Sequence, residues 1–217
     1  MTARGRPPGR TEKGEASRAA LYATAVKRFT EDGYEATTLR GIAREAGVSP
    51  ALLYKYFPSK QAVVMALYDD LSARFADGLA LPEAGWTVRV VTTLRFSLEV
   101  LAPHRATLAT VLPVLLTDRE HGLLSRGAFA SRDRVRACYV EAVAGSAHPP
   151  SHAVVLGRLA YFLQLGVLLW WLLDRSPDQR ATEGLLGMLE GLGPALGPML
   201  WIPGVGGTLD RLDALVA

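Results

Sequence analysis

The chain has 217 residues, a formal net charge of only +3 and a single cysteine, Cys138. One cysteine excludes an intramolecular disulfide framework, which fits a reducing cytoplasm, and the N-terminus lacks the apolar run of a signal peptide. Residues 1–60 hold 11 Lys or Arg against 6 Asp or Glu, whereas residues 61–217 hold 13 against 15. The basic surplus therefore lies in the first segment, as phosphate binding requires, although a solvated charged surface would give the same count.

Residues 1–10 (MTARGRPPGR) predict a disordered basic tail, because glycine and proline break any helix there and no apolar periodicity is visible. The arginines of this tail either reach along a neighbouring DNA groove, as flexible basic arms do, or contribute nothing specific. The sequence alone favours the second interpretation.

Residues 11–60 predict a small helical domain. It begins with an amphipathic helix from about residue 11 to residue 32, which stops at Gly33. One face of this helix carries apolar residues at helical spacing: Tyr22, Ala25, Val26 and Phe29.

Two short helical patterns follow, on either side of a tight turn at residues 47–49. Thr38 and Ser49 can cap the two helices, and Pro50 suits a first helical position. Gly47 lies just past the first helix, where a left-handed conformation is usual. The expected buried face comprises Leu39, Ile42, Ala43, Ala46, Leu53 and Phe57. This arrangement is typical of a helix-turn-helix, whose second helix enters the major groove of DNA.

The whole string from Phe29 to Lys60 resembles the DNA-binding domain of the TetR family of bacterial transcriptional regulators. The resemblance is carried by Phe29, Gly33, Tyr34, Thr37, Thr38, Ile42, Ala43, Ala46, Gly47, Val48, Ser49, Leu53, Tyr54, Tyr56, Phe57, Ser59 and Lys60. It covers about the first quarter of the chain. The rest resembles the family in length, in helical character and in its last two long helices.

Beyond Ser59 the sequence shows no strand alternation and predicts helices at about 59–79, 85–101, 105–116, 122–145, 151–174, 178–199 and 208–216. Pro113 and Pro194 fall inside two of these segments and should kink or shorten them. The expected fold is all-α: an N-terminal three-helix helix-turn-helix DNA-binding domain over 11–60, and a larger helical domain over 61–217. The resemblance implies that the larger domain binds a ligand and dimerises.

Residues 153–173 (AVVLGRLAYFLQLGVLLWWLL) are apolar and long enough to cross a membrane. Arg158 and Gln164 interrupt them, and a helix that is apolar all round can equally be buried in a protein, so we expect no membrane insertion. One stripe is expected to face its own domain: Leu159, Phe162, Leu163, Gly166, Trp170 and Leu173. A second stripe is expected to face another subunit: Tyr161, Leu165, Leu168 and Leu172.

The next helix carries a leucine seam, formed by Leu185, Leu189, Leu192 and Leu196. In the TetR family the last two long helices of each subunit commonly form a four-helix dimer interface. The resemblance therefore implies that 153–173 and 178–197 form this interface in a homodimer. The alternative is that both helices fill the core of a monomer.

The resemblance also assigns DNA contacts. Phosphate contacts are expected from Thr38, Tyr54, Tyr56 and Lys60, and base contacts from Arg40, Ser49, Pro50, Ala51, Leu52 and Lys55. The chain departs from the common family pattern at Ala51 and Leu52, which makes the DNA-facing side unusually apolar. A two-fold dimer would meet a palindromic operator whose half-sites lie about 34–36 Å apart, or a multiple of that.

A small-molecule pocket is expected in the larger domain, also by resemblance. Its candidate residues are Phe96, Val100, His104, Leu108, Leu112, Cys138, Tyr139 and Phe162, and for each apolar member ordinary core packing is the alternative. We expect no metal site, because Pro149 and Pro150 separate His148 from His152 and prevent a helical pair. No cofactor motif or catalytic constellation is visible.

The sequence therefore predicts a cytoplasmic, homodimeric transcriptional regulator, expected to be a repressor that an apolar or amphipathic effector releases from its operator. The first alternative is an all-α carrier or enzyme that retains a helix-turn-helix without regulating genes. The second is a membrane-anchored protein.

Overall fold

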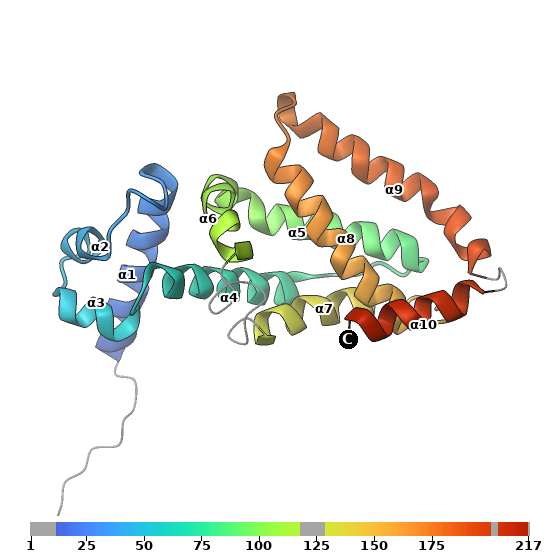
Figure 1. Ribbon diagram of the computed structural model, residues 1–217, viewed down its shortest axis with the longest axis horizontal. Helices are drawn as coiled ribbons and strands as arrows, with labels where there is room; N and C mark the ends of the chain where they lie inside the picture. The colour runs from blue at the N-terminus through green and yellow to red at the C-terminus, as the bar shows by residue number, and fades with distance from the viewer. Residues whose placement is uncertain (1–11, 118–128, 201–203, 217) are drawn as a thin grey trace, which may run out of the picture.

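The computed structural model describes residues 12–117, 129–200 and 204–216, and these residues form helices and turns but no strand (Figure 1). The helices are α1 (Glu12–Glu31), α2 (Leu39–Glu45), α3 (Pro50–Tyr56), α4 (Lys60–Gly78), α5 (Trp86–Leu101), α6 (Arg105–Thr117), α7 (Phe129–Ala144), α8 (Ala153–Leu173), α9 (Arg180–Met199) and α10 (Val205–Val216). The expected basic tail at 1–10 and the first part of the helix expected at 122–145 lie outside the described residues.

The N-terminal helices α1 to α3 and the first turns of α4 form a small unit, which we call the head. Its buried core comprises Leu21, Ala25, Phe29, Tyr34, Ile42, Ala43, Leu53, Phe57, Val63, Val64 and Val111. The core extends beyond residue 60, because Val63 and Val64 come from α4 and Val111 comes from α6. The head therefore packs directly on the remaining helices, which we call the body (Figure 1).

The helix starts of the head are set by side-chain caps, as the sequence predicts. Thr38 Oγ1 accepts a hydrogen bond from the Gly41 N–H at 3.1 Å, and Ser49 Oγ accepts one from Leu52 at 3.2 Å. Each bond satisfies a backbone donor that a helix end leaves free. Gly47 has φ +65°, so the turn between α2 and α3 uses the left-handed conformation expected of it.

The body is built around the close crossing of α7 and α8. A Cβ atom at Gly157 of α8 would lie 2.5 Å from Val140 Cα of α7, so only glycine lets the two backbones approach this far. Tyr139, Trp171 and Leu94 are among the residues buried around this crossing. In Figure 1, α8 crosses α5 and α7, while α4 runs from the head along the body.

The orientation predicted for α8 is wrong, because the two stripes of the helix are exchanged. Phe162, Leu163, Trp170 and Leu173 were expected to face their own domain and are exposed instead. Tyr161 is buried, and Leu165, Leu168 and Leu172 pack against the core of their own subunit. Gln164 and the close contact at Gly157 both lie on the buried side, which fixes the rotation of the helix.

A hydrogen-bonded turn joins α8 to α9. Asp174 accepts hydrogen bonds from the Ser176 N–H at 2.8 Å, the Thr182 N–H at 2.9 Å and the Thr182 hydroxyl at 2.6 Å. The bond from the Thr182 N–H satisfies a donor in the first turn of α9, and the bond from Ser176 fixes the turn before it. From this turn α9 diverges from α8, as Figure 1 shows.

The leucine seam of α9 is divided between the core and the surface. Leu185 and Leu189 pack against the core, whereas Leu192 and Leu196 are exposed. Pro113 and Pro194 do not shorten their helices, because α6 and α9 continue beyond them. The last helix, α10, returns to α8, where Asp210 lies 3.1 Å from His152 Nδ1.

Candidate DNA-binding surface and ligand cavity

Helix α3, the recognition helix, is held by its buried side and presents the other side to solvent. Leu53 is 1% exposed and lies in the core of the head, whereas Tyr54 is 47% exposed. Ser49, Pro50, Ala51 and Lys55 are also exposed, and Leu52 and Tyr56 are half-buried. The predicted base-reading residues of α3 therefore share an accessible surface.

Ion pairs neutralise some of the cations of the head. Lys27 and Arg28 of α1 lie 3.1 Å and 3.2 Å from the Glu45 carboxylate, and Arg28 also lies 2.6 Å from Asp32. The hydrogen bond to Glu45 raises the pKa of Lys27. These contacts tie α1 to α2 and neutralise the charge on that side.

Three cations of α2 and α3 are exposed and form no ion pair with a described residue: Arg40, Arg44 and Lys55. Arg40 and Arg44 lie on α2, and Lys55 lies on α3. Unneutralised cations are those that can displace counterions from DNA phosphates. Arg44 was absent from the predicted contact set, although its position four residues after Arg40 places both on one side of the helix.

Lys60 occupies a different setting from that of an exposed phosphate-binding lysine. Its ammonium group donates hydrogen bonds to the backbone carbonyls of Tyr34 at 2.7 Å and Glu35 at 3.3 Å. It also lies 4.3 Å from the centre of the Tyr34 ring. Lys60 therefore links the start of α4 to the loop before α2, and its phosphate contact stays a prediction.

A cavity of about 350 Å³ opens among α4, α5, α6, α7 and α8 of the body. Its wall is mostly aliphatic and aromatic and is formed by Val64, Leu67, Tyr68, Leu71, Ser72, Phe75, Ser97, Val100, Leu101, Leu108, Leu112, Val135, Tyr161, Gln164, Leu165, Gly166, Leu168 and Leu169. An apolar cavity of this size with a few polar groups is typical of a small-molecule site.

Two tyrosines add hydroxyl groups to this wall. Burial is the largest cause that raises the pKa of both Tyr68 and Tyr161. The neighbouring Tyr161 hydroxyl raises the pKa of Tyr68 further, because the two groups interact. Both hydroxyls therefore stay neutral, and the two tyrosines contribute no charge to the cavity.

Comparisons with known proteins agree with this architecture. The family model of bacterial regulatory proteins of the tetR family matches residues 21–67. The HTH-type transcriptional regulator HbdR from Aromatoleum sp. (strain CIB) is 30% identical over 192 residues, which cover 81% of this chain and 80% of that protein. The chain belongs to the TetR family. It is a DNA-binding transcriptional regulator and not an enzyme.

Other relatives extend the likeness to the TetR family. The regulator EthR from Mycolicibacterium smegmatis is 36% identical over 77 residues, which cover 36% of this chain and 35% of that protein. A TetR-family regulator from Streptomyces coelicolor superposes with a TM-score of 0.61, at 21% identity, and the match covers 93% of this chain and 97% of that one. A TetR regulator from Rhodococcus sp. RHA1 gives a TM-score of 0.63 at 21% identity, over 85% and 98% of the two chains. At these identities the two structures support the fold alone.

The cavity of this TetR-family regulator contains some of the predicted pocket residues and not others. Val100, Leu108 and Leu112 lie on its wall. The other five candidates do not line it: Phe96, His104, Cys138, Tyr139 and Phe162. The sequence did not reveal the six wall residues that α4 contributes.

Four of these five candidates pack elsewhere in the body, and the fifth, Phe162, is exposed. Phe96 and Tyr139 both stack with Phe75, with ring centres 6.0 Å and 6.3 Å from that ring. Cys138 packs against the core, and burial raises the pKa of its thiol. His104 lies in the short 3₁₀ turn before α6, where burial lowers its pKa.

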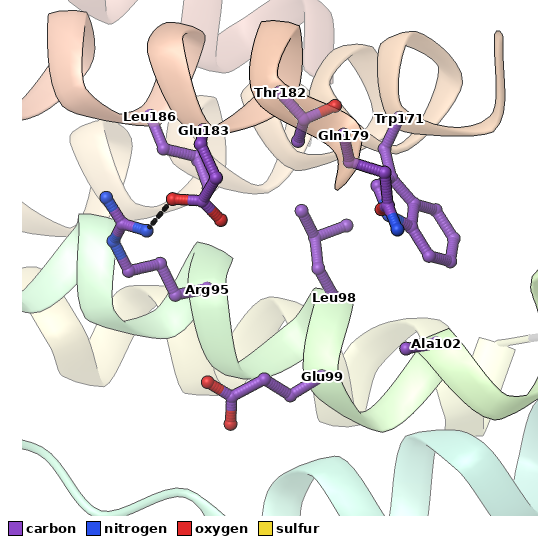
Figure 2. Close-up of a pocket in the computed structure, with 9 residues that line it drawn as sticks. All are labelled: Arg95, Leu98, Glu99, Ala102, Trp171, Gln179, Thr182, Glu183 and Leu186. Carbon is purple, nitrogen blue, oxygen red and sulfur yellow. Dashed lines mark hydrogen bonds and ion pairs between the residues drawn. The ribbon is translucent and has the colours of Figure 1, made fainter. Parts of the chain in front are cut away.

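A smaller hollow of about 190 Å³ lies between α5 and α9 (Figure 2). Figure 2 shows Arg95 and Glu183 facing each other across it, and their side chains pair at 2.5 Å. Arg95 also lies 3.9 Å from Glu190. Because these charged groups already pair, we interpret this hollow as part of the joint that holds α9 to the body.

Proposed function

We propose that this TetR-family regulator is a cytoplasmic homodimeric repressor that binds a palindromic operator and is released by a small molecule. Three features support the proposal: an accessible recognition helix, an exposed apolar surface on the two long C-terminal helices, and an apolar cavity connected to the head. The assignment as a repressor rests on the family resemblance, and a reporter assay tests it.

The recognition helix would enter the major groove and its neighbours would hold the phosphates. Arg40 and Lys55 can donate to guanine, while Ala51 and Leu52 can contact thymine methyl groups. Thr38 and Tyr54 are exposed, so each can donate its hydroxyl hydrogen to a phosphate oxygen. Arg44 joins this set, because it is an exposed cation with no ion-pair partner among the described residues.

The proposed dimer interface is the exposed apolar surface of α8 and α9, which we call the hairpin face. It consists of Phe162, Leu163, Leu169, Trp170, Leu173, Met188, Leu192 and Leu196. Leu173 is 68% exposed and Trp170 is 49% exposed, which is unusual for large apolar side chains gathered on two adjacent elements. A second subunit would cover this face. It would also explain why α8, which is long and apolar enough to cross a membrane, has an apolar outer surface.

The observation that carries the effector proposal is the sharing of two helices between cavity and head. On α6, Thr107 and Val111 are fully buried, and Val111 belongs to the head core, whereas Leu108 and Leu112 line the cavity. The hydroxyl of Thr107 also forms a hydrogen bond with Thr30 of α1. A molecule that displaces the cavity side of α6 therefore acts on the packing of the head.

Helix α4 makes the same connection, since Val64 lies both in the head core and on the cavity wall. A ligand changes DNA affinity only if it binds the DNA-competent and incompetent arrangements with different affinity. The shared helices would transmit such a preference, because a shift of α4 or α6 that makes room for a ligand also moves residues of the head core.

The test combines a gel-shift titration with a reporter assay. DNA upstream of the chain's own gene should bind far more tightly than a scrambled competitor of equal length, and sedimentation should show a dimer in detergent-free buffer. A reporter fused to that DNA should fall when the regulator is expressed. A monomer at micromolar concentration, equal binding to scrambled DNA, or a rise in the reporter would contradict the corresponding part of the proposal.

A further inference from the structure

The cavity contains one buried polar group whose hydrogen-bonding capacity is unused. Gln164 of α8 lines the cavity and is 8% exposed. Its Oε1 atom is buried and has no hydrogen-bond partner among the residues that the structure describes. A buried acceptor without a donor is costly, so such atoms are rare in native proteins unless a ligand or water satisfies them.

The serine hydroxyls on the cavity wall are already engaged. Ser72 Oγ donates to the Asp69 carbonyl at 2.9 Å and accepts from Arg134 at 2.6 Å. Ser97 Oγ donates to the Leu94 carbonyl at 2.7 Å. The two tyrosine hydroxyls of the wall interact with each other. Gln164 is therefore the wall residue whose buried acceptor makes no hydrogen bond with a described residue.

No charged side chain lines this cavity in the part of the chain that the structure describes. A carboxylate or ammonium group that entered would lose its hydration without gaining an opposite charge, which is strongly unfavourable. A neutral hydroxyl or N–H group loses far less, and Gln164 Oε1 can accept its hydrogen bond. The wall thus selects against charge and in favour of a single donor.

We propose that the cavity binds an uncharged, mostly apolar molecule whose hydroxyl or N–H group donates a hydrogen bond to Gln164 Oε1. This inference rests on the proposed role of the cavity as the effector site and specifies the chemistry of the effector. Ionised fatty acids and cationic amphiphiles are excluded as the preferred class. Neutral alcohols, phenols and amides are included.

Four probes of nearly equal size test the proposal on the full chain by isothermal titration calorimetry: octan-1-ol, its isomer heptyl methyl ether, octanoate and octylammonium. Octan-1-ol should bind about three- to tenfold more tightly than the ether, because only the alcohol donates a hydrogen bond. Both charged probes should bind more weakly than the ether. Equal binding of octanoate or octylammonium and octan-1-ol would overturn the preference for neutral ligands.

Two variants assign the hydrogen bond to its acceptor. Gln164→Met keeps the side-chain length and removes the acceptor, so octan-1-ol should bind this variant only as well as the ether does. Ser97→Ala is the matched control, because the Ser97 hydroxyl already bonds to Leu94, and it should preserve the difference between the two isomers. A difference that persists in Gln164→Met would overturn the role of Gln164. The wild-type probe series keeps the proposal testable if that variant does not fold.

A third variant separates this inference from the proposed function. Leu108→Trp replaces an isobutyl group on the cavity wall with a larger indole ring. This change should reduce the binding of all four probes. If it does so while octanoate binds the wild type as tightly as octan-1-ol, the cavity remains the ligand site and only the proposed ligand chemistry is wrong. If no probe binds the wild type at millimolar concentration, or Leu108→Trp changes nothing, the cavity is not the ligand site and the proposed function fails with it.

Discussion

The head and the body are both helical, but different forces fix their helices. In the head, α2, α3 and α4 each begin at a side chain that caps the helix: Thr38, Ser49 and Ser59. In the body, the N-cap residues of α5, α8 and α9 form no side-chain cap hydrogen bond. There the helices are positioned by apolar packing, as at the contact of Gly157 with Val140.

This difference explains what each part can do. Local caps and turns give the head one shape, which suits a surface that must match the fixed geometry of DNA. Apolar packing leaves the body with a cavity and an exposed hairpin face, which suit ligands and a second subunit. Apolar surface accommodates ligands and partners of many shapes, whereas a capped helix fixes the positions of the side chains that contact DNA.

The largest expected effect comes from placing a charge on the hairpin face. Trp170→Glu should give a monomer at micromolar concentration, because a carboxylate would be buried between two apolar surfaces. Operator affinity should then fall by at least about 100-fold. In the dimer, binding of one head holds the second head near its half-site, and a monomer loses this gain. Sedimentation and gel-shift titration measure the two effects.

Val88→Glu is the matched control, since Val88 is 41% exposed on α5, outside the hairpin face. It should leave both the dimer and operator binding unchanged. A Trp170→Glu protein that remains dimeric would place the interface elsewhere.

The next effect concerns the packing of the body. Gly157→Ala should lower the free energy of unfolding by about 1–3 kcal/mol, because the new Cβ would overlap the backbone of Val140. At Gly184 of α9 no neighbouring heavy atom lies within 4 Å of the added carbon. Gly184→Ala should therefore raise stability by roughly 0.5–1 kcal/mol. If Gly157→Ala and Gly184→Ala change the melting temperature equally, the α7–α8 crossing is less tight than the structure indicates.

The features that depend on neighbouring residues could be predicted from the sequence, and those that depend on packing between distant segments could not. Thr38, Gly47, Ser49 and Pro50 each act on their own neighbours in the chain, so their positions alone located α2, the turn and α3. The helix boundaries of the body were also predicted closely, because prolines and glycines mark them. The sequence does not reveal that Lys60 bonds to the carbonyls of Tyr34 and Glu35, because that contact depends on how α4 meets the preceding loop.

The rotation of α8 is the clearest failure, and it has a physical cause. The helix is apolar all round, so no polar face indicates which side is buried. Its small residues do carry a signal, because Gly157 and Ala160 lie on the buried side beside Tyr161 and Gln164. Small residues three positions apart indicate a close helix contact. Placing Gly157 and Ala160 on the buried side puts Phe162 and Trp170 on the outer surface.

A smaller and more selective effect is expected at Arg40, which is exposed on α2 and forms no ion pair with a described residue. Arg40→Ala should cost about 1–3 kcal/mol of operator binding and relax the preference at one base position, if the guanidinium reads a base. Gel shifts on a set of single-base operator variants measure this effect. Equal losses on operator and random DNA would show that Arg40 contacts phosphate instead.

Lys60 tests whether one residue of the head combines DNA binding with support of the fold. Lys60→Ala should lower the melting temperature without DNA, because the bonds to Tyr34 and Glu35 are lost. It should also reduce the slope of log affinity against log salt by about one, if the ammonium neutralises a phosphate. A lower melting temperature with an unchanged slope would make Lys60 a purely structural tether.

Asp174 is the exception in the body, because it organises a turn by hydrogen bonds as the caps of the head do. The bonds from Thr182 and Ser176 hold the pKa of the Asp174 carboxyl well below its usual range. A lowered folded-state pKa stabilises the fold above the unfolded pKa of about 3.9 and loses that contribution as the pH falls below it. Wild-type stability should therefore decrease on acidification more steeply than that of Asp174→Asn, as followed by thermal unfolding at a series of pH values.

The control for this comparison is Asp77→Asn, since Asp77 is exposed and forms no hydrogen bond or ion pair that involves a described residue. It should reproduce the wild-type pH profile. Because Asp174 joins α8 to α9, its loss should also weaken the hairpin face, so Asp174→Asn should shift the dimer toward monomer at neutral pH. If the pH profile flattens while the dimer is unaffected, the α8–α9 turn stabilises the subunit without positioning the surface proposed for its partner.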